Sequence, residues 1–230
     1  MRLRDVVNLV EEGEGFELEF KRKVSSPEKI ARTLSAFANT GGGIILFGVD
    51  DDGSLVGVDS EKTEADLLRH AADHHCDPPV PISVEYVPYH HRDIIVVSVE
   101  ESGEKPHFVV NDGEEDRAYI RVKDTTVIAS REVVKVLRDE RAERGLTVSI
   151  GENEKRLFAY LETHDRITVK EFASAVNVSE RRASRILTTL VRAGVIRIHT
   201  LEKTDYFTLA SPAEGSAPRR TSPRHTPPRR

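Results

Sequence analysis

The stretch SAFANTGGGIILFGVDD, residues 35–51, joins two different hydrophobic periods through three glycines. Before the glycines, the pattern from Pro27 to about Asn39 is that of a helix, with Ser26 as a candidate N-cap and Pro27 at the first helical position. After them, the apolar run over residues 44–49 predicts a buried strand. Glycines tolerate positive φ and so allow a tight turn between the two. The stretch therefore predicts a helix followed at once by a buried strand.

The segments around this stretch alternate between helical and strand patterns. Apolar spacing predicts helices over residues 2–12 and 61–74. Alternation predicts a strand around residues 16–20, a hairpin strand at 55–58 after the turn at 51–54, and two strand pairs, 83–89 with 93–100 and 107–111 with 118–122. We therefore expect an α+β domain over residues 1–145, with a mixed, largely antiparallel sheet.

Several short motifs occur in order along this half of the chain. They are EGFELEFK (residues 14–21), the stretch 35–51, IIVVSVE (94–100), Lys105-Pro106, Tyr119 to Arg121, and Thr125-Thr126. Together they resemble the Schlafen AlbA_2 domain over roughly residues 10–138. Although that family also carries an AAA label, no Gly-Lys-Ser/Thr follows the three glycines. The sequence therefore argues against a Walker A loop and against ATP as a ligand.

The resemblance implies a three-carboxylate site of the kind that Schlafen nucleases use. Residue by residue, that site falls on Glu14, Glu19 and Asp51. Clustered carboxylates can hold Mg²⁺ or Mn²⁺, which activates water and neutralises charge at a phosphodiester. Lys21, two residues after Glu19, is expected to point to the same face and to meet phosphate. The alternative is that these glutamates form a solvated strand face and that Asp51 belongs to a turn.

The C-terminal part shows the pattern of a winged helix-turn-helix, expected over residues 151–210. Residues 154–163 are helical, Thr168 and Glu171 have the spacing of a capping box, and Ser179 is a candidate N-cap for a third helix that ends before Gly194. Two apolar segments, 195–198 and 206–209, then predict a hairpin. This order resembles the winged DNA-binding domains of transcription regulators. The alternative is a winged helix that makes protein contacts.

The third helix carries a basic face. We expect it to enter the major groove, with Arg181, Arg182 and Arg185 near its N-terminal end, and we place Thr188 and Arg192 on the same face. Arginine can pair with guanine edges but also contacts phosphate, and the sequence leaves these roles open. Lys203, in the expected wing, is predicted to contact the DNA backbone.

Charge is distributed unevenly. Residues 1–150 carry 19 Lys/Arg against 30 Asp/Glu, residues 151–210 carry 10 against 8, and residues 211–230 carry 5 against 1. An acidic N-terminal half resists polyanions unless a cation or a local basic patch intervenes. The last twenty residues are rich in proline and arginine, which predicts a disordered basic tail that is either a solvated terminus or a nucleic-acid arm.

Composition restricts the class of protein further. The one cysteine, Cys76, excludes a disulfide framework and a four-cysteine zinc site. Although His70 and His74 have ligand spacing, no third and fourth ligands are defined, so we expect no zinc site. No apolar run reaches membrane-spanning length, and the N-terminus lacks a signal-peptide core. We expect a cytoplasmic protein, without a membrane partner, that forms a homodimer.

Three functional hypotheses follow. The favoured one is a DNA-binding transcriptional regulator that reads its site with the C-terminal helix. The second is a metal-dependent endoribonuclease that cleaves structured RNA such as tRNA at Glu14, Glu19 and Asp51. The third is a scaffold without nucleic-acid contact. The basic third helix favours the first, because three matching acids among 30 in residues 1–150 can persist by descent without activity.

Overall fold

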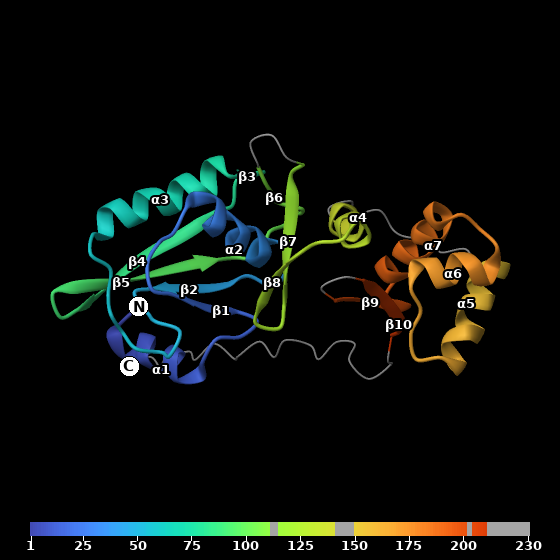
Figure 1. Cartoon of the computed structure of the whole chain (residues 1–230), viewed down its shortest axis with the longest axis horizontal. Helices are drawn as coiled ribbons and strands as arrows, with labels where there is room; N and C mark the ends of the chain where they lie inside the picture. The colour runs from blue at the N-terminus through green and yellow to red at the C-terminus, as the bar shows by residue number, and fades with distance from the viewer. Residues whose placement is uncertain (111–114, 141–149, 202–203, 211–230) are drawn as a thin grey trace, which may run out of the picture.

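The fold was obtained as a computed structural model, which describes residues 1–110, 115–140, 150–201 and 204–210. Figure 1 shows two parts side by side: an N-terminal part of sheets and helices, and a smaller C-terminal part of helices and a hairpin. The helices are α1 Leu3–Glu12, α2 Pro27–Asn39, α3 Glu61–His74, α4 Arg131–Glu140, α5 Glu152–Thr163, α6 Val169–Val176 and α7 Glu180–Arg192. The strands are β1 Leu18–Lys21, β2 Gly43–Phe47, β3 Cys76–Asp77, β4 Ile82–Tyr89, β5 Arg92–Val99, β6 Phe108–Val109, β7 Arg117–Val122, β8 Thr125–Ile128, β9 Ile196–Thr200 and β10 Asp205–Leu209.

The N-terminal part contains two four-stranded sheets with α2 between them. The first has the order β1-β2-β5-β4, in which β1 and β2 are parallel and the other pairs antiparallel. The second, β3-β6-β7-β8, is antiparallel throughout. The α+β class and the mixed, largely antiparallel sheet expected from the sequence are therefore confirmed.

Helix α2 is the centre of the main core. Its residues from Leu34 to Asn39 are all buried, and they pack with apolar side chains of α3, β2 and β5 and with Tyr119 of β7. The opposite face of the first sheet packs against α1 through Val6. Because both faces of this sheet are covered, residues 44–47 of β2 and 94–97 of β5 form continuous apolar runs rather than alternating ones.

The three glycines allow α2 to pass into β2 without a gap. Gly42 has φ +74°, and a Cβ there would lie 2.7 Å from the carbonyl oxygen of Val99. A Cβ on Gly43 would lie 2.5 Å from the ring of Phe37. The backbone therefore comes so close to β5 and to α2 that a side chain at either position would collide with them.

The hairpin strand expected at residues 55–58 does not form. Leu55 and Val58 each make an isolated bridge, to Val49 and Asp93, and the residues between them are not in a strand. Gly48 and Gly57 both have positive φ and approach each other closely. This geometry replaces the regular ladder, so that part of the prediction was wrong.

The C-terminal part has the expected order of three helices followed by a hairpin. It has its own apolar core, in which the large buried side chains are Leu157, Phe172, Leu187 and Phe207. Thr168 accepts the N–H of Glu171, and the Glu171 carboxylate accepts the N–H of Thr168 at 2.8 Å, so the predicted capping box is present. Ser179 caps α7 by accepting the N–H of Arg182.

Candidate functional site

The three predicted carboxylates lie in different environments. Glu14 precedes β1 and is exposed, and its Oε1 accepts the N–H of Phe20 at 2.7 Å. Asp51 is exposed in the turn that follows Val49. Glu19 lies within β1 and is only 8% exposed.

Both oxygens of Glu19 are engaged by cations. Its Oε2 lies 2.5 Å from Nη1 of Arg121, and its Oε1 lies 2.6 Å from Nζ of Lys21. The Arg121 side chain is 1% exposed and that of Lys21 is 36% exposed. The prediction that Lys21 lies on the same face as Glu19 is therefore confirmed. In the structure, the group that the Lys21 ammonium contacts is the Glu19 carboxylate.

This pairing bears on the predicted metal site. Within the described part of the chain, no group of three or more His, Cys, Asp or Glu side chains is placed to hold a metal ion. In this arrangement Mg²⁺ or Mn²⁺ would reach Glu19 only by displacing Arg121 and Lys21 from its carboxylate. The catalytic and metal-binding roles of Glu14, Glu19 and Asp51 stay predictions.

Arg121 also links three segments of the N-terminal part. Its Nη2 donates to the carbonyl oxygens of Gly15 at 2.7 Å and Asp124 at 3.0 Å, and its Nη1 donates to the hydroxyl of Thr126. Its guanidinium lies 4.9 Å from the centre of the Phe37 ring. The motifs containing Glu19, Arg121 and Thr126 thus meet in one buried polar cluster.

Asn39 and Ser35 form a second buried link, between α2 and the second sheet. The side-chain amide of Asn39 donates to the carbonyl oxygens of His107 (2.9 Å) and Tyr119 (3.0 Å), and its Oδ1 accepts the N–H of His107 at 2.8 Å. Ser35 donates to the His107 carbonyl oxygen and accepts the N–H of Tyr119. These motif residues satisfy backbone groups in the interior, which is a structural role.

Helix α7 presents a basic surface. Arg181, Arg182 and Arg185 are exposed, and Arg192 at the other end is partly exposed. In the described residues, the side chains of Arg181, Arg182 and Arg185 form no ion pair. Thr188, which we expected on this face, is instead 5% exposed, and its hydroxyl donates to the carbonyl oxygen of Ser184. Lys203 lies outside the described residues.

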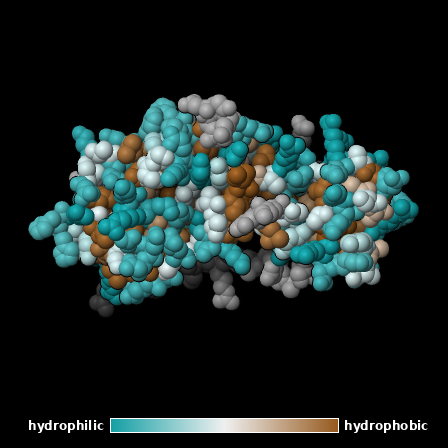
Figure 2. All heavy atoms as spheres, viewed as in Figure 1, coloured by the Kyte–Doolittle hydropathy of each residue, from teal (hydrophilic) through white to brown (hydrophobic). Residues whose placement is uncertain are grey.

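Helix α4 packs against α7, a contact that the sequence did not reveal. The hydroxyl of Ser184 on α7 donates to the carboxylate of Glu132 at 2.8 Å and accepts from Nζ of Lys135 at 2.6 Å. Ile198 of β9 packs against the apolar cluster of β7 and α4, and Ser130 donates to Asp205 of β10. In Figure 2, hydrophobic atoms gather near the middle of the face shown, between the two parts.

Burial alters the acidity of two groups outside the candidate sites. Burial raises the pKa of Asp205, the hydrogen bond from Ser130 opposes this, and the nearby charge of Glu132 raises it further. Burial also raises the pKa of Cys76 to about 12, so its thiol stays protonated at neutral pH and is not a nucleophile.

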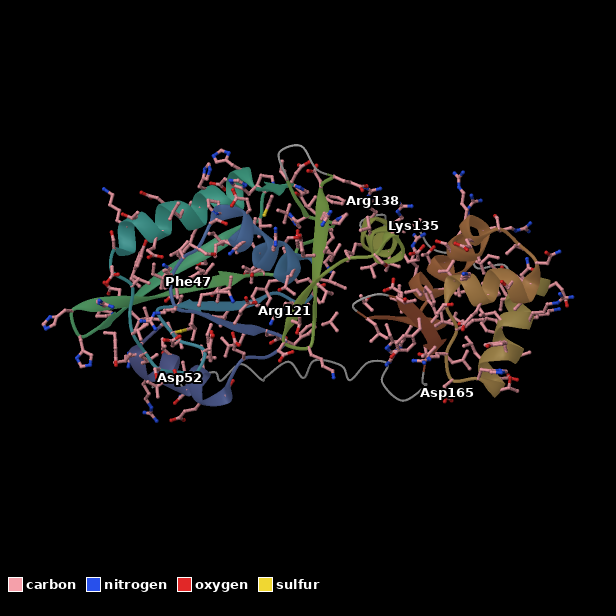
Figure 3. The ribbon with its side chains drawn as sticks, in the orientation of Figure 1. Phe47, Asp52, Arg121, Lys135, Arg138 and Asp165 are labelled. Atoms are coloured by element: carbon pink, nitrogen blue, oxygen red, sulfur yellow. The ribbon has the colours of Figure 1, made fainter. Side chains whose placement is uncertain are left out.

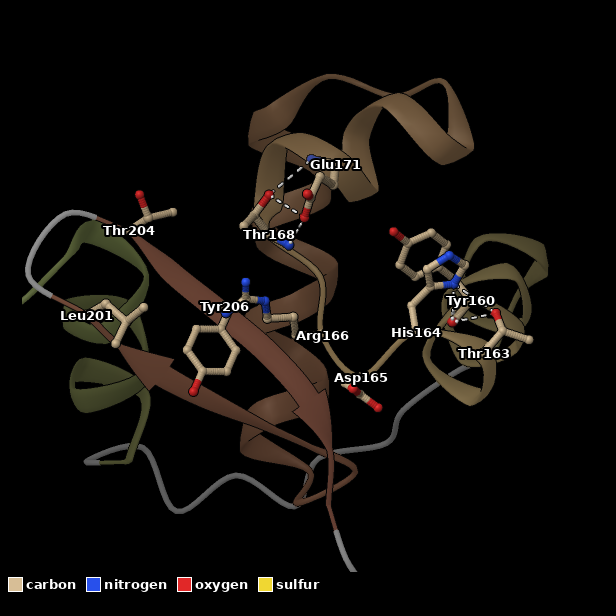
Figure 4. A pocket seen from close by; sticks show the side chains of 10 residues that line it. All are labelled: Tyr160, Thr163, His164, Asp165, Arg166, Thr168, Glu171, Leu201, Thr204 and Tyr206. Atoms are coloured by element: carbon tan, nitrogen blue, oxygen red, sulfur yellow. Dashed lines mark hydrogen bonds between the residues drawn. The ribbon is translucent and has the colours of Figure 1, made fainter.

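A cavity of about 570 Å³ opens in the C-terminal part, between α5, the start of α6 and the hairpin (Figure 4). The rings of Tyr160 and His164 stack there with centroids 4.1 Å apart, and the guanidinium of Arg166 lies 5.4 Å from the ring of Tyr206. This cavity contains none of the predicted site residues.

Comparison with known proteins identifies the N-terminal part. The family model described as Schlafen, AlbA_2 matches residues 14–130. The chain therefore belongs to the Schlafen AlbA_2 family. Among curated proteins, none matches the chain.

Among the solved structures that are similar to the chain are the following two. The DIP2311 protein from Corynebacterium diphtheriae has 16% sequence identity and a TM-score of 0.46, with 80% of this chain and 36% of that chain covered. The N-terminal domain of a putative ATP-dependent DNA helicase RecG-related protein from Nitrosomonas europaea has 21% identity and a TM-score of 0.39, with 55% and 92% covered. The chain thus spans little more than a third of the length of the first.

Over the described residues, no helix is both long and apolar enough to cross a membrane.

Proposed function

We propose that this protein is a DNA-binding transcriptional regulator whose C-terminal part is a winged helix-turn-helix with α7 as the recognition helix. The observation that carries the proposal is the group of exposed arginines without ion pairs at the start of α7, Arg181, Arg182 and Arg185. Membership in the Schlafen AlbA_2 family supports nucleic-acid binding as the general activity.

The local structure suits this role. In helix-turn-helix proteins, residues near the N-terminus of the second helix of the motif contact base edges in the major groove. Helix α7 follows α6 after a short turn in which Asn177 is left-handed, with φ +55°. Ser179 and the buried side chains of Ala183 and Leu187 fix the start of α7, so its arginines project from a rigid element. A guanidinium can donate two hydrogen bonds to one guanine.

The test is a binding titration with the full chain. Arg181→Ala combined with Arg185→Ala should weaken binding to labelled duplex DNA by at least about 30-fold, since losing each of the two arginine contacts costs about 1–3 kcal/mol. A matched control is Lys155→Ala combined with Arg156→Ala, which removes the same charge from the exposed side of α5. Equal affinities for the wild type and the α7 variant would exclude α7 as the recognition helix.

A metal-dependent endoribonuclease is the second candidate, and the match of Glu14, Glu19 and Asp51 to the carboxylate pattern of Schlafen nucleases favours it. The sharpest test uses Asp51→Asn, because Asp51 is exposed and its replacement should leave the fold intact. Purified protein would be incubated with labelled tRNA and either Mn²⁺ or EDTA. Metal-dependent cleavage that is lost in Asp51→Asn would establish an enzyme, whereas intact tRNA with every protein would exclude this activity.

A further inference from the structure

Helix α4 has a basic side that no sequence motif predicted. Arg131, Lys135 and Arg138 follow one another at spacings of four and three residues and are exposed. Residues at these spacings lie on one side of a helix. The opposite side buries Val133 and Leu137 against the second sheet. The helix is therefore amphipathic, and its outer surface carries three positive charges.

This basic side lies next to the arginines of α7. Nζ of Lys135 is 2.6 Å from the hydroxyl of Ser184, which lies on α7 three residues after Arg181 and one before Arg185. Residues three apart on a helix are neighbours on its surface, with about 5–6 Å between their Cβ atoms. Figure 3 shows Lys135 and Arg138 on α4, between the two parts of the molecule.

The acidic neighbours leave most of this charge uncompensated. Glu132 faces α7, where it accepts from Ser184 and lies 3.8 Å from Lys135. Arg131 forms no ion pair in the described residues, and the guanidinium of Arg138 lies 5.5 Å from the ring of Phe108. Beside these arginines is a cavity of about 380 Å³ whose rim also includes Arg117 and the acids Glu115 and Asp116. Of the charged side chains around the cavity, four are basic and two are acidic.

We propose that the basic side of α4 binds nucleic-acid phosphates and extends the contact made by α7 across the junction between the two parts. This inference rests on the proposed function, because it assigns further contacts to the same duplex. From Arg131 to Arg138 the helix rises about 10 Å, which equals roughly three steps along the axis of a DNA duplex. A duplex is favoured over a small anion because the basic residues form a strip along α4 that continues to α7.

The inference predicts a measurable salt dependence. Each phosphate contact contributes about 0.9 to the slope of log affinity against log salt concentration for duplex DNA. Removing Arg131 and Arg138 should therefore reduce the slope by roughly 2. If the variant and the wild type bind equally at roughly 1 M salt, this difference in slope makes the variant bind about 30-fold more weakly than the wild type near physiological salt. Lys135 is left in place because its bond to Ser184 joins the two helices, and its loss would also disturb their packing.

The experiment compares four full-length proteins by fluorescence anisotropy with a labelled mixed-sequence DNA duplex over a range of salt concentrations. They are the wild type, Arg131→Ala with Arg138→Ala, Arg181→Ala with Arg185→Ala, and a control, Lys62→Ala with Arg69→Ala, on the exposed side of α3. Thermal melting checks that each protein is folded. A lower slope for the α4 variant and an unchanged slope for the control would support the inference.

The other outcomes separate the inference from the proposed function. If the α7 variant loses affinity while the α4 variant keeps both affinity and slope, the inference about α4 is wrong and the proposed function is supported. If neither variant differs from the wild type, the inference and the proposed function are both wrong. A parallel titration with tRNA tests the identity of the nucleic acid. If the α4 variant bound tRNA more weakly than the wild type but bound the DNA duplex equally well, the inference that α4 and α7 contact the same duplex would be overturned.

Discussion

Replacement of Glu19 by alanine should destabilise the protein strongly. The change removes the carboxylate beside Arg121, whose side chain is 1% exposed and cannot reach bulk water. Breaking a buried ion pair by removing one partner typically costs about 3–5 kcal/mol, because a charge stays buried without compensation. Arg121 keeps its bonds to the carbonyl oxygens of Gly15 and Asp124, so we expect the lower end, about 3 kcal/mol. For a chain of this size that corresponds to a fall in melting temperature of roughly 6–12 °C.

Differential scanning calorimetry would test this value on four variants: Glu17→Ala, Glu19→Ala, Arg121→Met, and Glu19→Ala combined with Arg121→Met. Glu17→Ala, at an exposed position of the same segment, should melt within about 1–2 °C of the wild type. Glu19→Ala combined with Arg121→Met should lose less stability than the two single changes added together. The double variant removes both charges of the pair, so neither charge stays buried without its partner. If Glu19→Ala melted as high as Glu17→Ala, Glu19 would not be the buried partner of Arg121, and its assignment to a metal site would become stronger.

Three further experiments test other parts of the structure. Asn39→Ala should cost about 3 kcal/mol, measured by urea denaturation, because backbone groups of His107 lose their buried partner; an unchanged midpoint would contradict this. The raised pKa of Asp205 means that the folded state binds more protons than the unfolded state, so this group lowers stability as pH rises from the ordinary aspartate pKa of 3.8 through the raised pKa of the folded protein. Asp205→Asn, which can still accept from Ser130, should therefore reduce that loss, and an identical pH profile of melting would refute it. Cys76 should react with iodoacetamide at neutral pH far more slowly in the folded protein than in urea, because its thiol is buried and protonated.

The local elements of the fold could be predicted from the sequence. The helix at Pro27, the buried strand after the three glycines and the Thr168 capping box all depend on residues close together in the chain. The strand expected at 55–58 does not form, because Gly57 adopts a positive φ and lies close to the side chain of Arg92. Arg92 is 35 residues further along the chain, so no local pattern shows this contact. Short strands such as β3, with two residues, have too little periodicity to be recognised.

The environment of the candidate carboxylates could not be predicted in the same way. Glu19 alternates with apolar residues, and this pattern fits a solvated strand face or a metal ligand equally well. Its burial depends on Arg121, which is 102 residues away, and no local pattern encodes that pairing. The packing of α4 on α7 could not be predicted for the same reason, because the contacting residues Ser184 and Glu132 are 52 residues apart in the chain.

The placement of paired and unpaired cations decides where this acidic protein can bind a polyanion. Net charge alone would exclude the N-terminal part, where 30 acids face 19 basic residues in residues 1–150. Several cations there already have carboxylate partners, and these are Lys21, Arg22, Arg92, Lys105 and Arg121. The arginines at the start of α7 and Arg131 on α4 form no such pairs in the described residues. A phosphate backbone that binds there displaces counterions rather than protein carboxylates, and displacing counterions becomes less favourable as salt rises. The salt slope of the α4 and α7 variants therefore measures how many of these unpaired cations contact the nucleic acid.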